Sequence, residues 1–177
     1  SILAAHLAVD WDAYCGSDEE FDQVAGQLIR FAKLDVRNRI VRRYPLCAAL
    51  NALPRLLGRP SNRRLTRPGL LEHYYEKHLF GDKCLFQLPQ KPELHVLATN
   101  LSEGCLCSFN RQGLSVQTRD RGDFQHVPAG LATVAMAVTA SSAFPGFFPP
   151  LVLRAWDVGE NEGEFDTQAF TDGGVFD

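Results

Sequence analysis

Hydrophobic residues recur with helical spacing through the first part of the chain. Residues 1–9 are apolar on nearly every side, which predicts a buried helix that begins abruptly. Ser17 and Glu20 then have the spacing of a capping box, the pair of residues that marks the start of many helices. Apolar residues follow at helical spacing to about Lys33, so we expect an amphipathic helix packed on one face.

The pattern changes beyond this helix. Residues 30–67 are interrupted by prolines and predict short helices and loops at the surface. A further helix is expected to begin near Thr66 and to end at Gly81. Residues 129–142 are small and mostly apolar, which predicts a closely packed helix.

Segments typical of strands follow the middle helix. Residues 94–99 predict a strand that is buried on both faces for most of its length. Residues 105–109 and 114–118 have the spacing of a hairpin, and residues 151–155 predict a short strand. Helices that alternate with strands indicate a layered α/β or α+β domain, and we expect residues 1–177 to form a single one.

Charge is distributed unevenly along the 177 residues, which are 45% apolar and carry a net charge of −3. The segment Arg30–Arg67 holds eleven basic residues and one acidic residue, a local balance of +10. Such a segment can be an ordinary solvated surface or can bind an anionic membrane. Nucleic acid is not expected as a partner, because no nucleic-acid-binding module accompanies these charges.

No segment has the pattern of a membrane span. Residues 127–153 lack charge, but prolines interrupt them and the unbroken stretch is shorter than the about 20 residues that a span needs. The five cysteines are scattered and odd in number, which favours a reducing compartment. We therefore expect a cytoplasmic protein, and peripheral membrane contact through the segment Arg30–Arg67 is an open alternative to an ordinary solvated surface.

Several kinds of chemistry lack their sequence signatures. The chain contains no phosphate-binding loop, no dinucleotide-binding glycine motif and no Gly-x-Ser-x-Gly around any of its serines. His73 and His78 are five residues apart, which is poor spacing for two metal ligands on one helix. Neither a metal nor a cofactor is expected.

The tripeptide Asp172–Gly174 is the most informative short motif. A carboxylate followed by two glycines lies where the backbone turns tightly or where another group comes close. Such an aspartate can be a general base if a nucleophile lies beside it. Taken alone, the tripeptide is more typical of an ordinary Asp-Gly turn than of a catalytic base.

Three ordered segments together resemble the patatin-like phospholipase family. Residues 97–104 read LATNLSEG, residues 140–150 read ASSAFPGFFPP, and residues 170–177 read FTDGGVFD. The family has similar motifs in this order: a strand end, a helix end and an Asp-Gly-Gly turn. The resemblance is specific over residues 94–177 and weaker over residues 11–93.

The first residues are similar to the helix that follows the family's nucleophile elbow, the Gly-x-Ser-x-Gly turn. In this alignment Ser1 is not the nucleophile, and the nucleophilic serine and a glycine-rich oxyanion loop are expected upstream of residue 1. The chain is then a partial, N-terminally truncated patatin-like domain, with a central and mostly parallel sheet flanked by helices. On its own it is expected to be inactive.

The resemblance implies a lipid acyl hydrolase that cleaves fatty-acyl esters with a Ser–Asp dyad. Asp172 would be the general base, and Gly173 and Gly174 would let its loop approach the serine. The substrate would be an acyl lipid, and no metal or cofactor would be needed. Candidates for the acyl-facing wall are three aromatic residues that can equally well be plain core: Phe144, Phe147 and Phe148.

Two alternatives remain open at this point. The chain can be a catalytically inactive patatin-like module that binds lipid or protein through a basic membrane-facing surface. It can also be a basic interaction domain outside that family, for which salt-dependent binding of nucleic acid would be the evidence.

Overall fold

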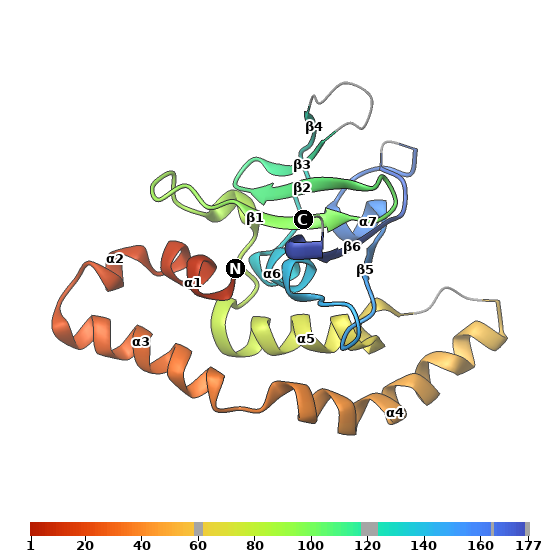
Figure 1. Ribbon diagram of the computed structural model, residues 1–177, viewed down its shortest axis with the longest axis horizontal. Helices are drawn as coiled ribbons and strands as arrows, with labels where there is room; N and C mark the ends of the chain where they lie inside the picture. Colours follow the sequence, from red (N-terminus) through yellow and green to blue (C-terminus); the bar gives the residue numbers. More distant parts are fainter. Residues whose placement is uncertain (59–61, 118–123, 164, 176–177) are drawn as a thin grey trace.

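The computed structural model describes residues 1–58, 62–117, 124–163 and 165–175, and shows an antiparallel sheet covered by helices (Figure 1). Residues 59–61 of the basic segment and residues 176–177 of the third motif lie outside the described residues. In the described part of the chain, six strands form one sheet in the order β4-β3-β2-β1-β6-β5. The strands are β1 (Val96–Asn100), β2 (Cys105–Asn110), β3 (Gly113–Gln117), β4 (Phe124–Val127), β5 (Leu151–Leu153) and β6 (Gln168–Asp172).

Every neighbouring pair in this sheet is antiparallel, so the expectation of a mostly parallel sheet is wrong. The sheet also curls strongly into a half-barrel. Short connections between strands are one physical cause of the antiparallel pairing, because a chain that reverses within a few residues can only pair antiparallel. Asn110 lies opposite Gly113, so two residues join β2 to β3, as the hairpin pattern predicted.

The turn between β1 and β2 is also short and consists of residues 101–104. The Asn100 side-chain oxygen accepts hydrogen bonds from the N–H groups of Ser102 and Glu103, at 3.0 and 3.3 Å. Gly104 completes the reversal with a φ of 64°, a conformation that favours glycine. Asn100 therefore shapes the turn that returns the chain along the sheet.

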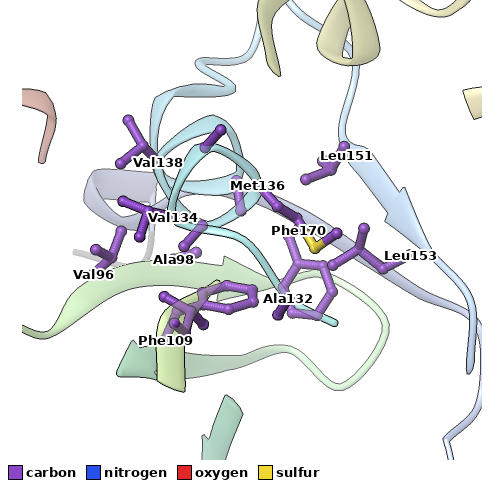
Figure 2. Packing of buried hydrophobic residues seen from close by; sticks show 14 of the residues in the cluster. Val96, Ala98, Phe109, Ala132, Val134, Met136, Val138, Leu151, Leu153 and Phe170 are labelled. Atoms are coloured by element: carbon purple, nitrogen blue, oxygen red, sulfur yellow. The ribbon is translucent and has the colours of Figure 1, made fainter. Parts of the chain in front are cut away.

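Helix α6 (Val134–Ser142) lies against the sheet and is the centre of the core. It contacts β1 and β6 on one side and α5 (Arg67–Tyr75) on another. Figure 2 shows Met136 of α6 among Phe170, Leu151 and Leu153. Phe109 and Phe170 meet edge to face with ring centroids 5.5 Å apart. The predicted small-residue helix is present, but it begins at Val134 rather than at residue 129, with Thr133 as its N-cap.

The N-terminal helices are α1 (Ile2–Val9), α2 (Trp11–Tyr14) and α3 (Asp18–Ala32). The predicted capping box is present at α3, where Ser17 N–H donates to the Glu20 carboxylate at 2.8 Å. Helix α1 is only half-buried, because Leu3 is exposed whereas Ala5 and His6 are buried. The expectation that it is buried on nearly every side is therefore wrong.

Helix α4 (Val36–Leu56) corrects the expectation of short helices and loops in the basic segment. It runs through Pro45 and Pro54 as one element, and a short 3-10 helix, η1 (Arg63–Leu65), follows it. Helix α4 lies on the outer side of α5, away from the sheet (Figure 1).

The remaining elements are short: a π-helical turn η2 (Glu76–Phe80), 3-10 turns η3 (Leu85–Gln87) and η4 (Gly173–Val175), and α7 (Ala155–Val158). Helix α5 and η2 together span the helix predicted from Thr66 to Gly81. Within the described ranges, no helix combines the length and apolar content that crossing a membrane requires.

Candidate functional site

The three motifs that carry the family resemblance meet at one point of the fold. Strand β6 ends at Asp172 and lies beside β1, with Asp172 opposite Ala98 in the register. The Thr99 hydroxyl donates a hydrogen bond to the backbone carbonyl oxygen of Asp172 at 3.0 Å. The first motif therefore holds the backbone of the third.

The end of α6 holds the same residue from another side. The backbone carbonyl of Ala143 accepts a hydrogen bond from the Thr171 hydroxyl at 2.6 Å and one from the Asp172 N–H at 3.3 Å. Thr171 is almost completely buried, so this contact has little competition from water. Sequence reasoning did not assign a role to Thr171 or Ala143, although both lie inside the motifs it identified.

The Asp172 carboxylate is partly held and partly free. Its Oδ1 atom accepts a hydrogen bond from the Gly174 N–H at 2.8 Å, which forms a turn at the start of η4. The residue is half-buried, and among the described residues its second oxygen has no hydrogen-bond partner. One oxygen is thus fixed in position, whereas the other can accept a proton.

The two glycines after Asp172 differ in what surrounds them. A Cβ atom on Gly173 would lie 2.9 Å from the carbonyl oxygen of Leu97, closer than real side chains come. A Cβ atom on Gly174 would lie 3.4 Å from Asp172 Oδ1, the edge of ordinary contact. Close packing against β1 therefore requires glycine at position 173 but not at position 174.

The aromatic residues after α6 are largely on the surface. Phe144 and Phe147 are 53% and 54% exposed, with ring centroids 6.3 Å apart, so they are not core. Phe148 is partly buried and packs against the core. Exposed aromatic rings can contact an apolar chain that approaches from solvent.

A hollow of about 250 Å³ lies beside these rings, between α4 and the segment that follows α6. Its walls are Ile40, Val41, Gly146 and the two phenylalanines Phe147 and Phe148, together with Arg37 and Arg67. The Arg37 guanidinium lies 5.6 Å from the Phe147 ring centroid. Arg67 lies 4.6 Å from the Tyr44 ring, and its buried Nε has no hydrogen-bond partner among the described residues.

These two arginines were missed as candidate site residues. The signal in the sequence was the basic segment, which identified the charges but not their position beside Phe147. The hollow combines apolar walls with guanidinium groups that lack a carboxylate partner among the described residues. It is thus suited to a ligand with an apolar chain and an anionic end.

A larger cleft of about 860 Å³ opens between α4, η1 and the segment around β5 and α7. Arg63 lies in its wall and ion-pairs with the buried carboxylate of Glu72 and with the partly buried carboxylate of Asp157, the latter at 3.0 Å. Burial disfavours the charged guanidinium, but these two carboxylates outweigh it and raise the pKa of Arg63. Because its charge is already balanced, we assign Arg63 to the stability of the fold.

Cys107 does not provide an alternative reactive centre. Burial raises the pKa of Cys107 to about 12, and its thiol donates to the carbonyl oxygen of Ala98 at 3.1 Å. Such a thiol is a packing group rather than a nucleophile. Within the described ranges, no group of three or more metal-ligating side chains is arranged to hold a metal ion.

Comparison of the chain with protein-family models, with curated proteins and with solved structures gives no match.

Proposed function

We propose that the protein is a lipid acyl hydrolase in which Asp172 is the general base of a Ser–Asp dyad. In this proposal the nucleophilic serine lies upstream of Ser1, as the motif resemblance implies. Asp172 takes the proton of the serine hydroxyl while the serine oxygen attacks the ester carbonyl of an acyl lipid. The protonated Asp172 then returns the proton to the leaving alcohol, and water releases the fatty acid from the acyl-enzyme by the same route.

The observation that supports this proposal best is the convergence of the three motifs on Asp172. Asp172 forms hydrogen bonds with Thr99, Ala143 and Gly174. Each of these three residues belongs to a different one of the three motifs. A base must be held at a fixed position to receive a proton efficiently. An ordinary Asp-Gly surface turn does not require hydrogen bonds from two other elements.

The exposed aromatic rings after α6 and the arginines near them indicate the class of substrate. Phe144 and Phe147 expose aromatic surface next to α6, and Arg37 and Arg67 line the hollow beside them. An acyl chain would pack on the rings, and a carboxylate or phosphate would pair with the guanidinium groups. This favours lipid esters over small hydrophilic esters as substrates.

The first test is the coding sequence immediately before the codon for Ser1. The proposal requires a Gly-x-Ser-x-Gly motif there, with a glycine-rich loop some tens of residues earlier. If another residue stands in place of this serine, the proposed hydrolase activity is refuted and the inactive binding module is favoured.

The second test is turnover by the protein that carries this elbow. We expect labelling by a fluorophosphonate probe and hydrolysis of a long-chain p-nitrophenyl ester. Asp172→Asn should lower kcat by about 10²–10⁴-fold. The matched control is Asp166→Asn, an exposed acid in the same part of the chain. Unchanged turnover in Asp172→Asn would overturn the assignment of the base.

A further inference from the structure

The outward face of α4 carries arginines in its first half and leucines in its second half. Arg39, Arg43, Leu46 and Leu50 follow one another at intervals of four, three and four residues. These intervals place the four side chains along one line of a helix. All four are exposed, with Leu46 at 67% and Leu50 at 57%.

A different face of the same helix makes the contacts with the fold. Ile40, Cys47 and Asn51 are buried, at intervals of seven and four residues. Helix α4 lies beside α5 and contacts it (Figure 1). The exposed leucines are therefore not used to attach α4 to the protein, although they are the residue type most expected to be buried.

The basic side chains of this face lack acidic partners in the part of the chain that the structure describes. Helix α4 contains no acidic residue. Among the described residues, no carboxylate forms an ion pair with Arg37, Arg39, Arg42 or Arg43. An anionic partner is thus complementary to this helix, and exposed leucine side chains require that the partner also has an apolar interior.

We propose that α4 docks the protein on an anionic lipid bilayer, with Leu46 and Leu50 inserted among the acyl chains. Arg39, Arg42 and Arg43 then pair with lipid phosphates at the same surface. A helix with apolar and basic side chains on one outward side lies in the plane of the bilayer interface. A nucleic acid fits this face less well, because single strands are bound by stacking on aromatic rings and α4 presents leucines there.

The inference goes beyond the proposed hydrolase activity and does not depend on it. Arg37 and Val41 of α4 also line the hollow beside Phe147. A bilayer bound to α4 would therefore also be close to the exposed Phe147 ring. Docking is nevertheless measured by binding alone, so its failure and the failure of the proposed activity are distinguishable.

The test is co-sedimentation of the full chain with vesicles of phosphatidylcholine containing increasing phosphatidylserine. We expect the bound fraction to rise with phosphatidylserine and to fall with salt. Arg42→Gln should weaken binding about fivefold. Leu50→Ser should weaken it about tenfold, because buried apolar area is lost. Both residues are exposed in the free protein, so the fold, checked by circular dichroism, should be unchanged.

Matched controls lie on other elements. Arg111→Gln removes an exposed arginine at the β2–β3 turn, and Leu131→Ser removes an exposed leucine before α6. Both variants should bind vesicles as the original chain does. Insertion itself is read from Leu50→Trp, whose fluorescence should be quenched by brominated lipids more strongly than that of Leu131→Trp.

Three outcomes overturn the proposal. The first is no binding to phosphatidylserine vesicles at low salt. The second is binding that Leu50→Ser leaves unchanged, which would indicate charge attraction without insertion. The third is self-association that Leu50→Ser abolishes without any vesicle binding, because α4 would then be the interface with a second copy of the chain.

Discussion

Thr171 donates its hydroxyl hydrogen to the carbonyl oxygen of Ala143 at 2.6 Å, which joins β6 to the end of α6. The next residue along β6 is Asp172, whose N–H donates to the same carbonyl. The position of the candidate base therefore depends on a contact that involves none of its own side-chain atoms.

Replacing Thr171 with valine tests this contact. Valine has the same shape but no hydroxyl, so the buried Ala143 carbonyl loses its shorter hydrogen bond. We expect the free energy of unfolding to fall by about 1–3 kcal/mol. Urea denaturation measures this change, with the exposed Thr167→Val as the control. Equal stability of the two variants would show that the contact with Ala143 does not stabilise the fold.

The two glycines after Asp172 provide a comparison between adjacent positions. Gly173→Ala should lower the free energy of unfolding by about 1–3 kcal/mol, because the new methyl group collides with the Leu97 carbonyl. Gly174→Ala should change it by less than about 1 kcal/mol, since its surroundings leave ordinary contact distance. Thermal or urea unfolding of both variants decides the matter. A larger loss of stability in Gly174→Ala than in Gly173→Ala would contradict the close packing of Gly173 against Leu97.

Replacing Arg63 should lower the free energy of unfolding more than the substitutions of Thr171 and the two glycines. Arg63→Met leaves Glu72, which is almost fully buried, without its charge partner. Breaking a buried pair from one side costs about 3–5 kcal/mol. The control is Arg64→Met, since Arg64 is exposed and forms no ion pair among the described residues. Simultaneous Arg63→Met and Glu72→Met should recover part of the lost stability. A double variant less stable than Arg63→Met would show that the charge on Glu72 is not the cause.

Local features could be predicted from the sequence because neighbouring residues determine them. Ser17 and Glu20 form their capping box within one helical turn, and Asn110 and Gly113 close their hairpin over two residues. The direction of the sheet could not be predicted in this way. It depends on the pairing of β6 with β1 and β5, which joins segments far apart along the chain.

In the candidate site, too, only features formed by neighbouring residues could be predicted from the sequence. Asp172 and its two glycines were identified from the sequence, because the motif order is local information. The hollow beside Phe147 was not, since α4 and the segment after α6 meet there only in the folded chain. Helix α4 itself was missed because Pro45 and Pro54 indicate interruptions, whereas the helix continues through both.

His6 should make the stability of the protein depend on pH. Its side chain is fully buried, and burial lowers its pKa from the ordinary value of 6.5, with Asp10 acting in the opposite direction. Its Nδ1 atom hydrogen-bonds the Tyr14 hydroxyl, and its Nε2 atom has no hydrogen-bond partner among the described residues. The folded state therefore favours the neutral ring.

The sign of the effect follows from which state binds the proton. As pH falls below 6.5, the unfolded chain protonates His6 before the folded chain does. The free energy of unfolding should then decrease, by at most about 1.4 kcal/mol per pH unit, until the pKa of the folded state is passed. Urea denaturation between pH 8 and pH 5 measures this slope. His6→Gln should flatten it, whereas His126→Gln, which changes an exposed histidine, should leave it unchanged. An equal slope in the original chain and in His6→Gln would assign the pH dependence to other groups.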